Sequence, residues 1–443
     1  MKFYNREKEI AKLLAIKQQS INAGQFTVVT GRRRIGKTQL LLKAYENEPF
    51  LYFFVSRKSE VLLCKDYQNE IVEKLGLPIL GEVTQFATLF EYILQQSIQQ
   101  PITLIIDEFQ EFFLVNSSVY SDMQRLWDLY QYKSKINLLV SGSVVSLMHK
   151  IFENNKEPLF GRAQHYIKVK PFETKVLKQI IKEYHPNFQA DDLLALYSFT
   201  GGVAKYVQLL MDNGAFTKNQ MLEYILAEDS IFINEGKNIL IEEFGKEYGI
   251  YFSILSAIAQ GHTSRNEIEQ MLQKEIGGYI TKMERDYHLL KKSKAMFSLS
   301  ESKNIKYIMQ DNFLIFWFRF IYKYGHIVEI GAFSQLKTLV DRDYATFSGM
   351  MLEKYFRTQA IESGNYTQVG NYWDRKGTIE IDYIAVNEIE KNIIFAEVKR
   401  NPDKIKLEKL KEKANSIIKT YSHLQEFECK FIALSLNDVV STI

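Results

Sequence analysis

The segment Gly31-Arg32-Arg33-Arg34-Ile35-Gly36-Lys37-Thr38 follows an apolar run, FTVVT at 26–30, and precedes the helical pattern QLLLKAY at 39–45. It fits the pattern G-x-x-x-x-G-K-[S/T] at a junction between a strand and a helix. Glycines let the backbone N–H groups of such a loop turn toward a phosphate, and the start of the next helix attracts anions. The segment therefore predicts a phosphate-binding loop shaped by Gly31 and Gly36. Lys37 is expected at the β and γ oxygens and the Thr38 hydroxyl on Mg²⁺.

The first 175 residues alternate short apolar runs with helical stretches. The runs are continuous and rich in β-branched and aromatic residues, which is typical of strands buried on both faces of a parallel sheet. They lie at 26–30, 50–55, 102–106, 136–140 and 166–169. This pattern predicts that residues 1–175 form an α/β domain, a P-loop NTPase core with a three-layer parallel sheet.

The apolar run at 102–106 ends in two acids, Asp107 and Glu108. In an open α/β sheet the ligand crevice lies at the carboxyl ends of the strands, so these carboxylates are expected to face the phosphate loop. Asp107 is predicted to hold Mg²⁺ through water, and Glu108 to be the general base for the attacking water. The run at 50–55 lies between the loop and this acid pair. That order is typical of P-loop proteins with an added central strand and a catalytic glutamate.

Five segments occur in a fixed order along the chain: the loop at 31–38, ITLIIDE at 102–108, LFGRA at 159–163, TGGVAKYV at 200–207 and DNFLIFWFRFIY at 311–322. Together they resemble an archaeal-type P-loop ATPase family that is similar to AAA+ and STAND proteins. The resemblance covers the whole length and implies a P-loop ATPase core, a winged helix and a C-terminal domain similar to PD-(D/E)XK nucleases. One departure is Ala204, where the family usually has proline, so that Gly201 and Gly202 alone must form the turn.

Further residues of the first domain are candidates for nucleotide binding. Asn5 and Arg6 resemble the short N-terminal box that flanks the adenine in AAA+ and related ATPases. Ser141 ends the run at 136–140, and we favour it over Ser143 as a sensor of the γ-phosphate. Arg162 precedes the fifth run, from which an arginine can reach the γ-phosphate of its own or a neighbouring subunit, although an ordinary surface arginine is the alternative. The predicted cofactors are ATP and Mg²⁺.

The middle of the chain changes to helical patterns. Residues 176–240 predict a helical lid, and 241–325 predict three helices followed by a β-hairpin, as in a winged helix-turn-helix. Ser264 and Glu267 predict a capping box on the second helix. The third helix is expected at 279–292, and the hairpin strands at 295–299 and 305–309, joined by SESKN.

Basic residues recur every three or four positions through the expected third helix, which would place many of them on one face. They are Lys282, Arg285, His288, Lys291 and Lys292. Lys282, Arg285, Lys291 and Lys292 are therefore candidate DNA contacts. A winged helix that binds a protein is the alternative interpretation.

Residues 326–443 predict a restriction-endonuclease-like α/β domain. A hairpin at 379–399 that turns at 389–390 pairs residues whose numbers sum to 779, which sets Asp382 opposite Glu397. Alternation then places Lys399 on the face of Glu397. The two carboxylates are expected to hold Mg²⁺ or Mn²⁺, and Lys399 to stabilise the hydroxide or the phosphate.

Two residues complete this candidate nuclease site. The resemblance adds Glu353, on the helix that opens the domain, as a further metal ligand. Arg400 begins a basic stretch that is predicted to contact DNA phosphates. A structural ion-pair cluster, or a degenerate nuclease domain that only binds, is the alternative.

Composition limits the possible classes of protein. A net charge of +3 provides no bulk attraction for nucleic acid, so any DNA contact must be local. Two cysteines, Cys64 and Cys429, exclude a disulfide framework and suit a reducing compartment. The start of the chain is charged, and the most apolar stretch, 312–322, carries Arg319 and is too short to span a bilayer. A soluble, cytoplasmic protein without a membrane partner is expected.

These observations predict an ATP-hydrolysing protein that couples its nucleotide state to a DNA-binding C-terminal half, with Mg²⁺-dependent DNA cleavage as a further activity to be tested. A nucleotide-dependent signalling or scaffold protein is the alternative. In that case the C-terminal domains would bind protein partners and the nuclease-like site would be inactive. A homo-oligomer or a protein partner is open in either case.

Overall fold

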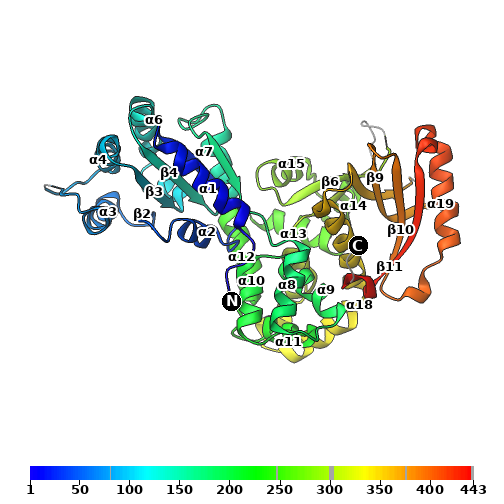
Figure 1. The fold of residues 1–443 in the computed structure, drawn as a ribbon. Helices are drawn as coiled ribbons and strands as arrows, with labels where there is room; N and C mark the ends of the chain where they lie inside the picture. The colour runs from blue at the N-terminus through cyan, green and yellow to red at the C-terminus, as the bar shows by residue number, and fades with distance from the viewer. Residues whose placement is uncertain (80, 246–247, 299–303, 375–376, 441–443) are drawn as a thin grey trace. The chain divides into compact units, whose positions relative to one another are not determined.

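A computed structural model of the chain describes residues 1–79, 81–245, 248–298, 304–374 and 377–440 (Figure 1). Backbone packing divides it into two compact units, Lys2–Lys170, and Met1 together with Pro171–Ile443. The four parts predicted from the sequence divide the chain more finely and stay a prediction. Among the helices of the described ranges, none combines the length and the hydrophobicity that a membrane crossing requires.

The unit Lys2–Lys170 is built on a parallel sheet that has five strands in its described part, in the order β2-β3-β4-β1-β5. The strand β4 lies between β1 and β3, which is the added-strand arrangement predicted from the sequence. Both β3 and β4 are buried along their whole length, as their continuous apolar runs indicated. The strands are β1 (Gln25–Thr30), β2 (Leu51–Phe54), β3 (Ile102–Asp107), β4 (Ile136–Gly142) and β5 (His165–Lys168).

Helices cover both faces of this sheet and give the predicted three layers. On one face Val28, Ile106 and Val140 belong to a core that also contains residues of α3, α4 and α6. The alternate residues Val29 and Ile105 are also completely buried, and α1 contacts β1 and β4. The helices are α1 (Glu7–Ser20), α2 (Lys37–Ala44), α3 (Glu60–Leu75), α4 (Phe86–Gln99), α5 (Phe112–Val115), α6 (Ser118–Tyr130) and α7 (Val145–Glu153).

The second unit begins with the predicted helical segment. Its helices are α8 (Thr174–Tyr184), α9 (Ala190–Thr200), α10 (Ala204–Asp212), α11 (Lys218–Ile225) and α12 (Ile231–Phe244). Gly201 and Gly202 separate α9 from α10 with φ angles of 58° and 73°. A Cβ on Gly202 would lie 2.5 Å from the Phe172 carbonyl oxygen, so this turn requires glycine. Ala204 is the first residue of α10, a position where proline is also favoured.

Three helices and a two-stranded antiparallel hairpin follow: α13 (Tyr248–Ala259), α14 (Arg265–Leu272), α15 (Gly277–Arg285), β6 (Leu290–Lys294) and β7 (Ile305–Met309). The predicted capping box of Ser264 and Glu267 is confirmed. The predicted third helix is too long, because α15 ends at Arg285 and His288 then adopts a positive φ of 51°. Solvent-facing lysines look alike on a helix and on an exposed strand, so their spacing could not mark this boundary.

The first hairpin strand was predicted in the wrong place. Residues 290–294 pair with β7, whereas Ala295 and Met296 join the core of the C-terminal sheet. The Met296 amide donates to the Asn371 carbonyl at 3.0 Å. Most of the predicted turn SESKN lies outside the described residues.

The rest of the chain contains long and short helices and a mixed sheet. A buried segment follows, formed by α16 (Asn312–Phe316) and the π-helical turn η3 (Trp317–Tyr322). Its core residues include Phe316, Trp317 and Phe318. It is followed by α17 (Gly325–Glu329) and by α18 (Phe333–Ser363), the long helix that carries Glu353. The described part of the sheet has the order β11-β10-β9-β8. Its strands are β8 (Gln368–Trp373), which was not predicted, β9 (Glu380–Asn387), β10 (Asn392–Lys399) and β11 (Glu428–Ser435).

The helix α19 (Leu407–Thr420) runs along this sheet in Figure 1. It packs through Leu410, Ala414 and Ile417 into a core that includes Ile393 and Phe395 of β10. The helix α18 contacts β8, β9 and β10. The hairpin of β9 and β10, which carries the second candidate site, is thus supported by two helices.

Candidate functional site

Three strand ends meet at the phosphate loop. Gly142 at the end of β4 pairs with Thr30, the last residue of β1 before the loop. Asp107 ends the neighbouring strand β3. Because carboxyl ends of parallel strands share one edge of the sheet, β4 carries Ser141 between the loop and Asp107.

The predicted residues Thr38 and Ser141 both contact the predicted metal ligand Asp107. Thr38 Oγ1 donates to Asp107 Oδ2 at 2.6 Å, and Ser141 Oγ donates to Asp107 Oδ1. Asp107 and Ser141 are buried. A hydroxyl and a carboxylate that lie together fit Mg²⁺, which prefers oxygen ligands and keeps several waters.

The loop backbone adopts the conformation that its glycines permit. Gly36 has a φ of 97° and precedes Lys37, the first residue of α2. Gly31 has a φ of 154°, and a Cβ there would lie 2.8 Å from the Val169 carbonyl oxygen. Both positions therefore require glycine, as expected for a loop whose N–H groups turn inward.

Lys37 is buried beneath this loop. Its Nζ donates to the carbonyl oxygens of Gly31, at 2.9 Å, and Arg32, at 3.3 Å. Burial lowers the pKa of the Lys37 ammonium, and the nearby Glu108 and Asp107 charges oppose that shift. A buried cation that is held by neutral carbonyls fits an anionic ligand such as a phosphate.

Glu108 stands immediately after β3 with a left-handed backbone, φ 53° and ψ 43°. Its Oε2 accepts hydrogen bonds from Gln110 Nε2 at 2.6 Å and from Ser143 Oγ at 2.7 Å. Ser143 and Gln110 thus hydrogen-bond to the expected general base, whereas Ser141 hydrogen-bonds to Asp107. The two serines at the end of β4 serve different carboxylates.

Sequence reasoning missed Tyr52 and Gln110. Tyr52 OH donates to Asp107 Oδ2 at 2.9 Å, from the neighbouring strand β2. Gln110 is buried and lies close to Gly142, where a Cβ would be 2.4 Å from its Oε1. A hydroxyl in the otherwise apolar strand LYFF was the one available signal for Tyr52.

The outer residues predicted for the nucleotide are held by groups of the protein. Arg6 is buried, and its guanidinium donates to the Lys170 carbonyl at 2.8 Å and to Glu9 at 3.2 Å. Asn5 next to it has a φ of 46°. Arg162 forms a bidentate ion pair with Asp128 of α6, in which Nη2 donates to Oδ2 at 3.1 Å and Nε to Oδ1 at 3.3 Å. The structure thus does not join Arg162 to Lys37 or Glu108.

The second candidate site lies on the hairpin of β9 and β10. The strand pairing runs from Asn387 with Asn392 to Tyr383 with Ala396, so paired numbers sum to 779 and the predicted register is confirmed. Lys399 Nζ lies 2.8 Å from Asp382 Oδ2 and 3.8 Å from Glu397 Oε1. The three predicted side chains therefore converge.

Glu353 approaches this group from α18. Partial burial, to which the Asp382 charge adds, raises the pKa of Glu353 to about 7. Arg357 Nη1 lies 3.6 Å from Glu353 Oε2 and also donates to the Asp382 carbonyl. Within the described residues, however, no three His, Cys, Asp or Glu side chains are grouped as a metal site. The predicted metal ligands Glu353, Asp382 and Glu397 are thus not preassembled, because cationic side chains pair with the carboxylates.

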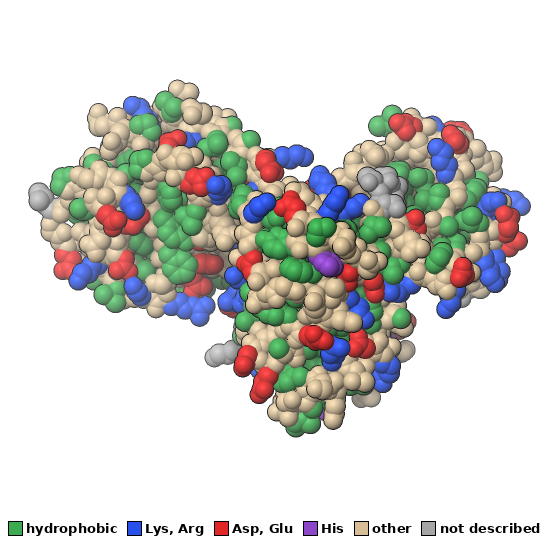
Figure 2. Space-filling view, turned by 60° about the horizontal axis from the view of Figure 1, so that its bottom comes forward, with side chains coloured by type: hydrophobic (Ala, Val, Ile, Leu, Met, Phe, Trp, Pro, Cys, Tyr) green, Lys and Arg blue, Asp and Glu red, His purple; other side chains and the backbone are tan. Residues whose placement is uncertain are grey.

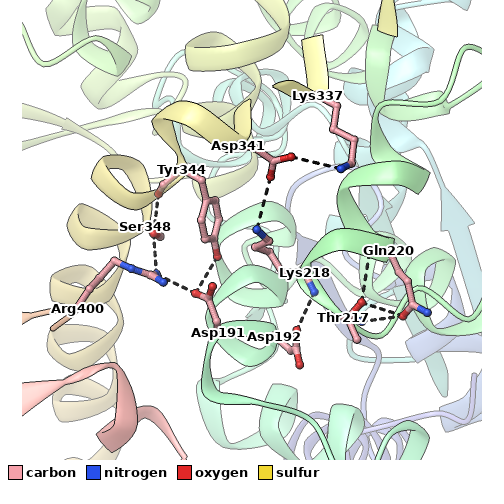
Figure 3. A network of polar contacts seen from close by, with 10 residues as sticks. All are labelled: Asp191, Asp192, Thr217, Lys218, Gln220, Lys337, Asp341, Tyr344, Ser348 and Arg400. Carbon is pink, nitrogen blue, oxygen red and sulfur yellow. Dashed lines mark hydrogen bonds and ion pairs between the residues drawn. The ribbon is translucent and has the colours of Figure 1, made fainter. Parts of the chain in front are cut away.

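Arg400, a predicted DNA contact, forms polar contacts within the chain (Figure 3). Its Nη1 donates to Asp191 Oδ1 at 2.8 Å and to Ser348 Oγ at 2.7 Å. Tyr344 OH donates to the same Asp191 oxygen at 3.1 Å, and the guanidinium lies 5.4 Å from the Tyr344 ring centre. The residue after Lys399 is therefore fixed to α9 and α18 and is used inside the chain.

Figure 3 also shows polar contacts from α11 to both α9 and α18. The Lys218 amide donates to Asp192 Oδ1 at 2.8 Å, and Lys218 Nζ lies 3.5 Å from Asp341 of α18. These contacts join the predicted lid to the helix that carries Glu353.

The four other predicted DNA contacts are exposed but occupy two elements. Lys282 and Arg285 lie on α15, whereas Lys291 and Lys292 lie on β6. Lys292 pairs with Glu284 at 2.6 Å. On the face drawn in Figure 2, basic and acidic side chains are interspersed over both units, in agreement with the net charge of +3.

Comparison with known proteins agrees with this architecture. Residues 3–210 match a family described as an ATPase domain predominantly from Archaea. Residues 317–415 match a family of archaeal and bacterial proteins of unknown function. A solved structure, the Walker-type ATPase of Pyrococcus abyssi, has a TM-score of 0.54 and 18% identity and covers 72% of this chain and 96% of its own. At that identity the likeness shows a common fold.

Two curated relatives come from Methanocaldococcus jannaschii. An uncharacterized protein is 29% identical over 411 residues, which are 90% of this chain and 87% of the relative. An uncharacterized ATP-binding protein is 25% identical over 328 residues, 58% of this chain and 86% of the relative. Residues 3–210 are thus similar to an archaeal ATPase domain, in agreement with the phosphate loop and the acid pair that they contain.

Proposed function

We propose that the unit Lys2–Lys170 binds ATP with Mg²⁺ and hydrolyses it. The observation that carries this proposal is the convergence of Thr38, Asp107 and Glu108 on the loop that buries Lys37. The match of residues 3–210 to an ATPase domain family and the similarity to an ATP-binding protein of Methanocaldococcus jannaschii support it.

Each residue has a distinct task in this proposal. Lys37 and the loop N–H groups bind the phosphates, and Thr38 with Asp107 would hold Mg²⁺, which neutralises charge on the γ-phosphate. Glu108 orients the attacking water and accepts its proton. Gln110 and Ser143 fix the Glu108 carboxylate by two hydrogen bonds to one oxygen, so that Oε1 is left for the water.

Removal of the metal tests this function on the full chain. We expect ATP hydrolysis in Mg²⁺, and a decrease of at least 100-fold in EDTA, because Thr38 and Asp107 act on the phosphates through the cation. Phosphate release is the measurement, and binding of a fluorescent ATP analogue is followed in parallel. Hydrolysis that continues undiminished in EDTA, or a chain that neither binds nor hydrolyses ATP, contradicts the proposal.

A second candidate function concerns the C-terminal half. We propose that α13–α15 with β6 and β7 form a winged helix that binds DNA through Lys282, Arg285, Lys291 and Lys292, and that Asp382, Glu397 and Lys399 form a nuclease-like site. The observation in its favour is the convergence of two carboxylates and a lysine on one hairpin. A divalent cation would have to displace Lys399 from Asp382, since the carboxylates are paired in the structure.

Cleavage of DNA by the full chain tests this second function. With Mg²⁺ or Mn²⁺ we expect nicking of plasmid DNA that decreases at least tenfold in Asp382→Asn, because one of two ligand carboxylates is lost. Glu390→Gln, in the hairpin turn, is the matched control and should cleave like the wild type. Cleavage that is absent in the wild type or unaffected in Asp382→Asn, with an ATPase rate that does not respond to DNA, supports the scaffold alternative.

A further inference from the structure

The Asp107 carboxylate accepts hydrogen bonds on both oxygens. Thr38 Oγ1 and Tyr52 OH donate to Oδ2 at 2.6 and 2.9 Å. Ser141 Oγ and the Glu108 amide donate to Oδ1, the latter at 3.0 Å. Asp107 is only 2% exposed. Four donors around a buried carboxylate determine the direction in which its oxygens point.

The Tyr52 hydroxyl reaches Asp107 from the neighbouring strand. Tyr52 lies on β2, at the edge of the sheet, where it pairs with Ile105, while Phe54 pairs with Asp107. Tyr52 and Asp107 therefore point to the same side, and the long phenol side chain reaches along the strands to Oδ2. A phenol hydroxyl carries its proton at neutral pH, so Tyr52 is a hydrogen-bond donor to this carboxylate.

We propose that Tyr52 is a positioning residue for the divalent cation that accompanies ATP. Its hydroxyl holds Asp107 in the orientation that keeps Oδ2 beside Thr38 Oγ1, the two groups that would face the metal. This inference rests on the proposed ATPase function and concerns metal recognition within it. Without Tyr52, Thr38 is the one side-chain donor among the described residues that still bonds to Oδ2, and Thr38 itself would ligand the cation. Part of the binding energy of the metal would then be used to orient Asp107.

The substitution Tyr52→Phe removes this hydroxyl and keeps the ring and the β propensity of the strand. The measurement is the affinity of a fluorescent, non-hydrolysable ATP analogue, first in EDTA and then across a Mg²⁺ titration. The ratio of the two affinities is the coupling between metal and nucleotide. We expect this ratio to fall about three- to tenfold, the size of the net contribution of one ordinary hydrogen bond. The affinity in EDTA should change less than about twofold, since the Tyr52 hydroxyl faces Asp107 and the Thr38 side chain, the two groups that would act on the phosphates through the cation.

Tyr45→Phe is the matched control. Tyr45 is also buried in this unit, and its hydroxyl bonds to Asn137 and to the Leu13 carbonyl, away from Asp107. Its metal coupling should equal that of the wild type, and the thermal unfolding transition of each variant shows that it is folded.

Each outcome of this experiment is decisive. An unchanged coupling ratio in folded Tyr52→Phe overturns the positioning role. An equal loss of affinity in EDTA and in Mg²⁺ also overturns it, because it indicates a general structural effect. A wild-type chain that does not bind the analogue in either solution refutes the ATPase proposal itself, and is thereby distinguished from failure of the Tyr52 inference alone.

Discussion

Lys37→Ala is expected to reduce ATP affinity at least 100-fold and to abolish hydrolysis. The Lys37 ammonium is buried and is held by two carbonyl oxygens, so no other described group occupies its place under the loop. Its loss removes the charge that would neutralise the β and γ oxygens, and 100-fold corresponds to about 2.7 kcal/mol. Equilibrium binding of a fluorescent ATP analogue measures the change.

The control for this prediction is Lys43→Ala on the same helix. Lys43 is exposed and pairs with Glu46 at 2.6 Å, so its loss should alter ATP affinity less than twofold. The fold should survive Lys37→Ala, because burial already disfavours the charged form of Lys37, as its lowered pKa indicates. Unchanged ATP affinity in a folded Lys37→Ala chain would refute the assignment of the phosphate loop.

Glu108→Gln is expected to preserve ATP binding and to slow hydrolysis by about 10²- to 10⁴-fold, the usual contribution of a general base. A glutamine fits the same space and can still accept the hydrogen bond from Ser143, but it cannot take a proton from water. Single-turnover hydrolysis, compared with analogue affinity, separates the chemical step from binding.

Glu111→Gln provides the matched substitution three residues away. Glu111 pairs with Arg57 at 2.8 Å, so the hydrolysis rate of Glu111→Gln should remain near that of the wild type. A rate for Glu108→Gln within threefold of the wild type would show that another group activates the water. A combined loss of binding and rate would point to a structural role for Glu108.

The strand register at the second site could be predicted from the local sequence pattern. The prediction that Asp382 lies opposite Glu397 needed only the two strand ends and one turn. The pairing of β9 and β10 has the predicted register as far as Tyr383 with Ala396, the pair before Asp382 and Glu397. The metal ligands could not be predicted in the same way. Arg357, which pairs with Glu353, lies on α18, and only the packing of that helix on the sheet brings it to the hairpin.

Arg400 shows the same limit more clearly. In the sequence it is one of several basic residues after Lys399, and a stripe along phosphates was a reasonable interpretation. In the structure it bonds to Asp191, 209 positions earlier in the chain. The wrong extent of the third helix has a related cause, because the lysines of β6 face solvent just as lysines on a helix do.

The sequence by itself determined the phosphate loop, the strands of the parallel sheet and the acid pair after β3. These features depend on contiguous residues, since a buried strand needs an unbroken apolar run and the loop needs glycines at fixed spacing. Only the tertiary structure decided which serine serves which carboxylate, that Tyr52 reaches Asp107, and that Arg400 is used inside the chain. Those contacts join segments that are distant in sequence, and their existence depends on strand order and helix packing, which no local pattern encodes.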